Sequence, residues 1–98
     1  MDIKFAWDEK KDTANKKKHG VSFEEAAEVF DDPLHVSLLD HRFDYFDERW
    51  VTIGATKNGV CIVVGHLYCF TENDEETIRI ITARKASTKE REQYETIA

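Results

Sequence analysis

The sequence has 98 residues, close to the usual size of a single domain, and we expect one domain over residues 1–98. Its net charge is −6 and 35% of its residues are charged, a composition that by itself argues against a nucleic-acid partner. No apolar run is long enough to span a bilayer and the first residues lack the pattern of a signal peptide, so we expect a cytoplasmic protein without a membrane partner.

The chain begins with a predicted strand and helix. Residues 3–7 alternate as a strand does, and Asp8 stands where the N-cap of a helix belongs. We expect the helix over residues 9–18, because three lysines precede His19 and Gly20. Basic side chains favour the end of a helix, and glycine favours the left-handed residue that stops it.

A second, shorter helix follows at once. Ser22 and Glu25 form a capping-box pattern, and apolar residues then recur at helical spacing. This helix is expected to end at residues 31–33, since the residue before a proline is disfavoured in helical geometry.

Three strands are predicted in the middle of the chain. The first covers residues 34–39, and residues 40–48, which are acidic and aromatic without a clear period, are predicted to form a connecting loop. Residues 50–57 and 60–70 are rich in Val, Ile, Thr and aromatic side chains and favour strands. The Asn58-Gly59 pair between them indicates a tight hairpin.

The last third completes an α+β fold. Residues 72–75 predict a turn, residues 77–83 a strand, and the capping-box pattern of residues 87–90 a helix that runs to about residue 97. The order predicts an antiparallel sheet of about four to five strands, flanked by two N-terminal helices and one C-terminal helix.

The cysteines and histidines do not suggest a disulfide, a metal site or a cofactor site. Cys61 and Cys69 lie in one predicted strand, which holds their α-carbons about 26 Å apart, far beyond the reach of a disulfide. The four histidines show no paired ligand spacing, and no phosphate-binding glycine motif occurs. We therefore expect neither a metal nor a cofactor.

Lys18 and His19 lie at the predicted corner between the two helices. A rigid corner presents side chains to solvent, so His19 is a candidate for phosphate contact or proton transfer near neutral pH. The structural alternative is that both residues stabilise the end of the first helix.

Three arginines form a second group of candidates. Arg49 and Arg79 share strand parity with apolar neighbours, namely Val51 and Ile53 for the first and Ile81 and Ala83 for the second. An arginine on such a face needs a partner, which is either an acid such as Glu48 or a phosphate held by two hydrogen bonds. Arg84 is an odd number of residues from Arg79, so in a regular strand their side chains point to opposite faces.

The first interpretation of Tyr94 and the two tryptophans is structural. Tyr94 is next to Arg91 on the last predicted helix and either covers the sheet edge or takes part in a site. Trp7 and Trp50 are expected in the core.

Over residues 5–94 the sequence resembles the BrnT toxins. The resemblance rests on motifs that occur together and in order: Lys18-His19-Gly20-Val21-Ser22-Phe23-Glu24-Glu25-Ala26, Glu48-Arg49-Trp50, Ile78-Arg79-Ile80-Ile81-Thr82-Ala83-Arg84 and Glu90-Arg91-x-x-Tyr94. Thr82 departs from the pattern, where serine is common, and the acidic turn at residues 72–76 is rather long.

The resemblance implies a RelE-like fold and a ribonuclease that cleaves RNA without a metal and thereby inhibits translation. It also implies a cognate BrnA antitoxin that forms a hetero-oligomer with the toxin. Operator DNA is then bound by the antitoxin, and the toxin reaches it only indirectly. For RNA cleavage by the 2′-hydroxyl, the roles are then as follows: Arg49, Arg79 and Arg84 stabilise the phosphate, Lys18 contacts the RNA backbone, His19 or Glu48 is the base, and Tyr94 orients the substrate or is the acid.

A different class of function stays open at this point. Residues 21–50 hold nine acidic residues and only two arginines. The acidic stretch at residues 24–48 is suited to a basic antitoxin segment, and the chain would then be a binding module without catalysis.

Overall fold

The computed structural model describes residues 3–40, 48–70 and 72–97 and confirms the predicted order of elements. In chain order these are β1 (Lys4–Ala6), α1 (Glu9–His19), α2 (Phe23–Glu28), the 3-10 turn η1 (Val29–Asp31), β2 (Val36–Leu39), β3 (Trp50–Ala55), β4 (Cys61–Phe70), β5 (Glu76–Lys85) and α3 (Thr88–Ile97). Of the loop predicted at residues 40–48, residues 41–47 lie outside the described ranges. No helix in these ranges is long and apolar enough to cross a membrane.

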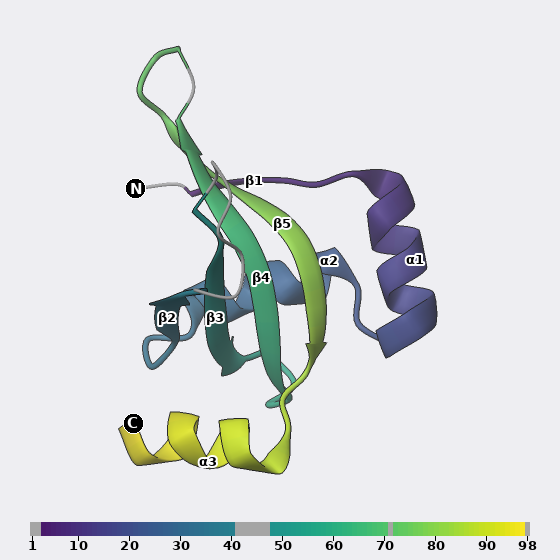
Figure 1. Cartoon of the computed structure of the whole chain (residues 1–98), viewed down its shortest axis with the longest axis vertical. Coiled ribbons are helices and arrows are strands. Elements are labelled where there is room, and N and C mark those ends of the chain that lie inside the picture. The colour runs from purple at the N-terminus through teal and green to yellow at the C-terminus, as the bar shows by residue number, and fades with distance from the viewer. Residues whose placement is uncertain (1–2, 41–47, 71, 98) are drawn as a thin grey trace.

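The five strands form one mixed sheet in the order β1-β5-β4-β3-β2 (Figure 1). The four strands from β2 to β5 form the expected antiparallel meander. β1 departs from the predicted antiparallel sheet, because it lies at the edge parallel to β5. Alternation within residues 3–7 predicts a strand but says nothing about its partner, which lies more than 70 residues away.

The predicted caps set the ends of the first two helices. The Asp8 side chain accepts hydrogen bonds from the N–H groups of Lys10 and Lys11, and Gly20 takes the left-handed conformation at φ 73°. Ser22 and Glu25 form the predicted reciprocal capping box. These local contacts fix where the chain turns between α1 and α2.

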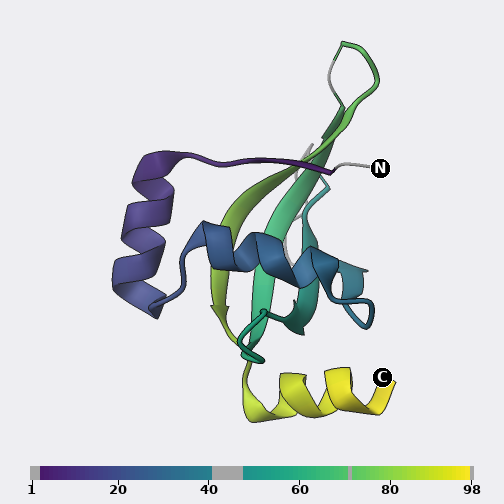
Figure 2. The same cartoon turned by 180° about the vertical axis from the view of Figure 1, so that it is seen from behind.

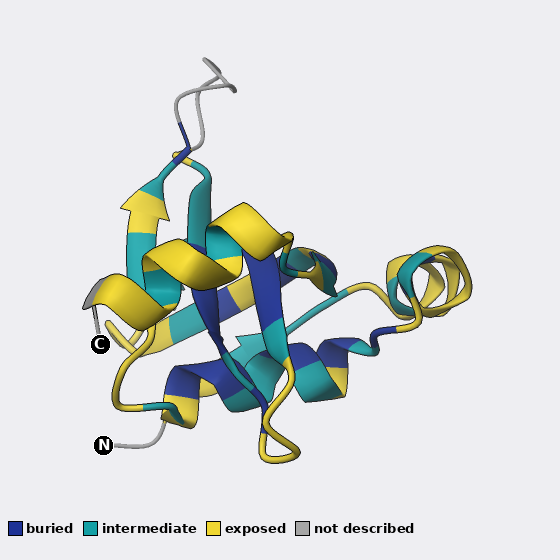
Figure 3. Cartoon of the chain, turned by 90° about the horizontal axis from the view of Figure 1, so that it is seen from below, coloured by how far each residue is buried: buried dark blue, intermediate teal, exposed yellow. Residues whose placement is uncertain are grey.

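The helices pack on both sides of the sheet. α2 crosses one side (Figure 2), and the core lies between it and the central strands, with Phe23, Ile62 and Ile80 all at most 1% exposed. α3 lies on the other side, near one end of the sheet, with much of its surface exposed (Figure 3). We call these two sides the α2 face and the opposite face.

α1 is attached to the edge of β5 by one buried side chain. The Asn15 amide nitrogen donates to the carbonyl oxygens of Val21, at 2.9 Å, and Ala83, at 2.8 Å. Its oxygen accepts from the Ala83 N–H at 3.1 Å. Since β1 pairs with β5 only at Thr77–Arg79, Asn15 supplies the backbone of β5 with a partner beyond the end of β1.

A bulge interrupts the ladder between β4 and β5. Gly65 lies opposite Thr82, whereas the next residue, His66, lies opposite Ile80. Ile81 is therefore an extra residue on β5, and side chains after it alternate in the opposite sense.

The bulge corrects the predicted parity of Arg79. Ile80 and Ala83 are both buried in the core on the α2 face, although they are an odd number of positions apart. Arg79 is exposed and does not share a face with Ala83, so the predicted alternation with Ile81 and Ala83 is wrong. A strand pattern read with a constant period of two misses such a shift.

Candidate functional site

A pocket of about 190 Å³ lies on the opposite face, where two of the predicted arginines meet. We call it the arginine pocket, and its lining residues are Asp40, Arg49, Val51, Val63, Gly65, Thr82 and Arg84. β3, β4 and β5 supply five of these residues, and the other two, Asp40 and Arg49, directly follow β2 and precede β3. The sheet and the hydrogen bond from the Asp40 N–H to the Arg49 carbonyl therefore set their spacing.

The centre of the pocket depends on the absence of a side chain on β4. A Cβ at Gly65 would come within 2.6 Å of the Thr82 hydroxyl oxygen. Glycine therefore lets the Thr82 side chain lie over the neighbouring strand. The bulge at Ile81 is what turns Thr82 and Arg84 towards this face.

Arg84 is held in a fixed orientation by the start of α3. Its two terminal nitrogens donate to the two carboxylate oxygens of Glu90 at 2.7 and 2.8 Å. Glu90 also accepts from the Ser87 N–H at 2.9 Å, which completes the predicted capping box. The hydrogen bonds from Arg84, followed by those from Ser87, lower the pKa of Glu90 to about 2, so this pair stays ionised at neutral pH.

Arg79 lies on the same face, beside the arginine pocket. It is opposite Leu67, two residues along β4 from Gly65, and Gly65 is opposite Thr82. Neighbours on one face of a strand are about 7 Å apart, within the span of one nucleotide phosphate and its sugar. The odd spacing between Arg79 and Arg84 is thus compensated by the bulge, and the two predicted arginines lie on one face.

Glu48 lies in a different place from its neighbour Arg49. The two residues are consecutive and line different pockets, Glu48 with Trp50 and Arg49 with Val51. Glu48 therefore does not line the arginine pocket. Trp7 packs against the core cluster, close to its expected place. Trp50 is only half-buried beside Tyr68 and lines a pocket, so the expectation that it lies in the core is not met.

Tyr94 docks α3 onto the turn before β2. Its hydroxyl donates to the carboxylate of Asp32, which also accepts from the N–H groups of Leu34 and Ala55, at 2.9 Å each. The hydrogen bond to Asp32, together with burial, raises the pKa of Tyr94 to about 12. Proton release from this hydroxyl is correspondingly harder.

Lys18 and His19 form the last residues of α1, with Gly20 as the cap. Lys18 is exposed and His19 is half-buried. Neither is among the residues that line the arginine pocket.

Two polar residues of the arginine pocket, Asp40 and Thr82, were not predicted as site residues. Asp40 is only 9% exposed, and its N–H donates to the Arg49 carbonyl at 2.7 Å, which extends the pairing of β2 and β3 by one step. An acid directly after the predicted strand at residues 34–39 was the available signal. For Thr82 the signal was its place between Arg79 and Arg84 in one motif.

Comparison with known proteins agrees with the predicted resemblance. Residues 7–90 match the model of a family described as "Ribonuclease toxin, BrnT, of type II toxin-antitoxin system". The chain belongs to the BrnT family.

The fold also matches a solved BrnT structure, that of the Brucella abortus ribonuclease toxin BrnT. The TM-score is 0.62 at 24% sequence identity, over 89% of this chain and 100% of the other. A search of curated proteins found no match.

Membership of the BrnT family establishes the class of function. The chain is a ribonuclease toxin of a type II toxin–antitoxin system, a class that implies an antitoxin partner. Within the described ranges, no three His, Cys, Asp or Glu side chains lie close enough together to hold a metal ion.

Proposed function

We propose that this BrnT-family chain cleaves RNA at the arginine pocket, without a metal. One observation carries the proposal: Arg49 and Arg84 line one pocket, and Arg79 lies beside it on the same face. A guanidinium group matches the oxygens of a phosphodiester in shape and charge. Arg84, which is already paired with Glu90, would contribute its positive charge and its remaining N–H groups.

In the proposed reaction the 2′-hydroxyl of a nucleotide attacks the adjacent phosphorus atom. The bond to the 5′-oxygen of the next nucleotide breaks, which leaves a 2′,3′-cyclic phosphate and a free 5′-hydroxyl. A base takes the 2′-hydroxyl proton, and an acid returns a proton to the leaving oxygen. The arginines stabilise the additional negative charge of the pentavalent phosphorus in the transition state.

The proton-transfer roles stay predictions. The predicted base is His19 or Glu48, and Tyr94 is the predicted orienting group or acid. None of these residues lines the arginine pocket, and neither does Lys18, the predicted contact to the RNA backbone. RNA is a long ligand, and Lys18 at the end of α1 would contact a segment beyond the cleaved bond.

The proposal is tested with Arg79→Ala and the matched control Lys85→Ala. Both residues are exposed cations of β5, but Lys85 pairs with Ile62 on the α2 face. We expect Arg79→Ala to slow RNA cleavage about 100-fold, in the range for loss of one charge-stabilising group, while Lys85→Ala cleaves normally. Excess EDTA is expected to leave the rate unchanged.

Equal activity of the two variants would contradict the placement of the site. Intact RNA after incubation with the purified chain, both alone and with ribosomes, would contradict catalysis itself. Circular dichroism and thermal unfolding of each variant separate loss of activity from loss of fold.

We also propose that the antitoxin is of the BrnA type, that it forms a hetero-oligomer with the toxin and that operator DNA is reached only through it. The type II class supports a protein partner, and an RNA substrate supports action in the cytoplasm. Co-expression of the chain with the antitoxin encoded beside it, followed by mass measurement in solution, tests the assembly.

A further inference from the structure

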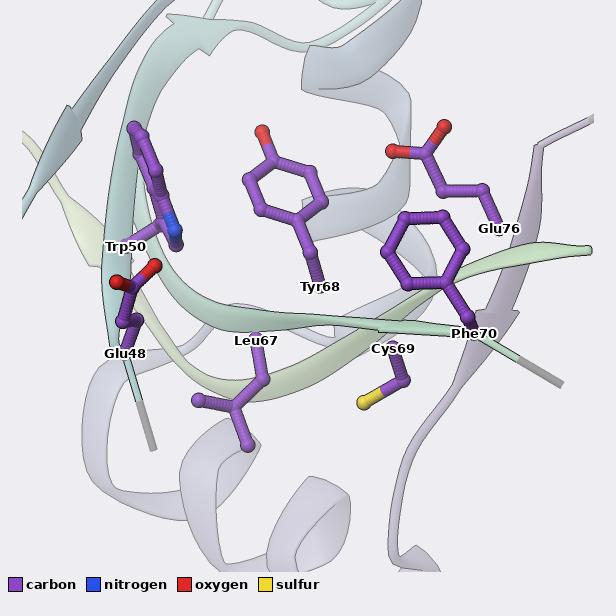
Figure 4. Close-up of a pocket in the computed structure, with 7 residues that line it drawn as sticks. All are labelled: Glu48, Trp50, Leu67, Tyr68, Cys69, Phe70 and Glu76. Carbon is purple, nitrogen blue, oxygen red and sulfur yellow. The ribbon is translucent and has the colours of Figure 1, made fainter. Parts of the chain in front are cut away.

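A second and larger pocket lies on the α2 face, beyond the end of α2. Its volume is about 540 Å³, and we call it the aromatic pocket. Its lining residues are Glu48, Trp50, Leu67, Tyr68, Cys69, Phe70 and Glu76. Figure 4 shows Trp50, Tyr68 and Phe70 on one side of β4, with Leu67 and Cys69 directed to the other side.

The aromatic walls are fixed by packing within the sheet. The rings of Trp50 and Tyr68 meet edge to face with centroids 5.4 Å apart, and Tyr68 meets the buried His66 in the same way at 5.0 Å. Phe70, in contrast, is 70% exposed at the end of β4. A large apolar side chain left in water beside two ordered rings is typical of a surface that another molecule covers.

Two carboxylates flank these rings. Glu48 and Glu76 are both exposed, and within the described residues neither forms an ion pair. The adjoining turn adds further acids, since residues 72–75 contain three more acidic side chains. Only one of these, Glu75, pairs with Lys4 across the sheet edge among the described residues.

We infer that the aromatic pocket binds an arginine or lysine side chain of the antitoxin. A cation is attracted to the faces of Trp and Tyr rings, and a guanidinium also forms two hydrogen bonds with a carboxylate. The pocket offers both kinds of contact, and the acidic turn beside it attracts a basic segment from a distance.

The same charges argue against RNA as the occupant. Phosphates are repelled by Glu48, Glu76 and the acidic turn, whereas the arginine pocket, which suits them, is on the opposite face of the sheet. The inference rests on the antitoxin partner that the family implies and not on the position of the ribonuclease site. Antitoxin and RNA would then contact different faces.

The test compares variants at the pocket with matched controls. Phe70→Ser and Glu76→Gln change the pocket, while Val60→Ser and Glu95→Gln make the same changes at exposed positions elsewhere. The dissociation constant is measured by calorimetry for the purified antitoxin encoded beside this chain, at two salt concentrations. Thermal unfolding checks each fold.

We expect Phe70→Ser and Glu76→Gln each to weaken antitoxin binding about tenfold, with a smaller salt dependence for Glu76→Gln. The two controls bind normally, and all four variants cleave RNA at the original rate. An alanine scan of the arginines and lysines of the antitoxin then identifies one side chain whose replacement weakens binding to the original chain but causes no further loss of binding to Phe70→Ser.

Antitoxin binding equal to that of the controls would overturn the inference. Weaker RNA binding by Phe70→Ser, with normal antitoxin binding, would also overturn it and would assign the pocket to a nucleobase. Neither result depends on Arg79→Ala, so failure of the ribonuclease proposal is detected separately.

Discussion

Replacing Asn15 with alanine removes three hydrogen bonds that join α1 to the end of β5. The Ala83 N–H, the Ala83 carbonyl and the Val21 carbonyl lose their partner, and both of these residues are at most 2% exposed. Each buried backbone group left without a partner costs about 1 kcal/mol or more, which gives a loss of about 3 kcal/mol. For a domain of this size the melting temperature is then expected to fall by about 15 °C.

Urea unfolding at pH 7 measures this loss as a lower midpoint with an unchanged slope. Asn15→Asp is expected to be at least as damaging. The oxygen that replaces the amide nitrogen has no N–H to donate and would face the carbonyl oxygens of Val21 and Ala83. Thr13→Ala is the control, since Thr13 is exposed on the same helix and its hydroxyl donates to the Glu9 carbonyl within α1. A loss below about 1 kcal/mol for Asn15→Ala would refute the claim that Asn15 replaces a strand partner for β5.

Two further predictions concern charge. Burial lowers the pKa of His66 from 6.5 to about 4, so the unfolded chain binds a proton more readily than the folded one in that interval. Stability is therefore complete above pH 6.5 and falls by about 3 kcal/mol as the pH drops to 4, and urea titrations of His66→Phe should lack most of this loss. Glu90→Gln breaks the pair with Arg84 and part of the cap of α3, and it is expected to cost about 1 kcal/mol because Arg84 is partly exposed. RNA cleavage should fall as well, because the guanidinium loses its orientation; an unchanged rate would show that this orientation does not matter.

Signals carried by adjacent residues predicted much of the fold. Asp8, Gly20, the Ser22 capping box and Asn58-Gly59 each act through hydrogen bonds or dihedral angles within a few residues. The structure places a cap or turn at each of these positions. Caps and turns of this kind depend on residues that are close together in the sequence, so a sequence pattern predicts them.

Features that depend on distant partners could not be predicted in this way. The parallel pairing of β1 with β5, the contact of Asn15 with Ala83 and the shifted register at Ile81 all arise when remote segments meet. A regular strand would place Arg79 and Arg84 on opposite faces, and the bulge that brings them to one face could not be predicted from the sequence. Glu48 and Arg49 line different pockets because consecutive residues of an extended segment point to opposite faces. Residues 40–48 were predicted to form a loop, so this alternation was not expected at Glu48.

The extra residue at Ile81 has a consequence for how such a site arises and is lost. Deleting this one amino acid would join Ile80 directly to Thr82 in a regular ladder, with Thr82 still opposite Gly65 and Arg84 still opposite Val63. A ladder that kept every residue of β5 but lacked the bulge would instead turn Thr82 and Arg84 towards the core and Ala83 towards solvent. The arginine pocket is therefore expected to tolerate deletion of the residue at position 81, but not a β5 of unchanged length in which that residue joins the ladder.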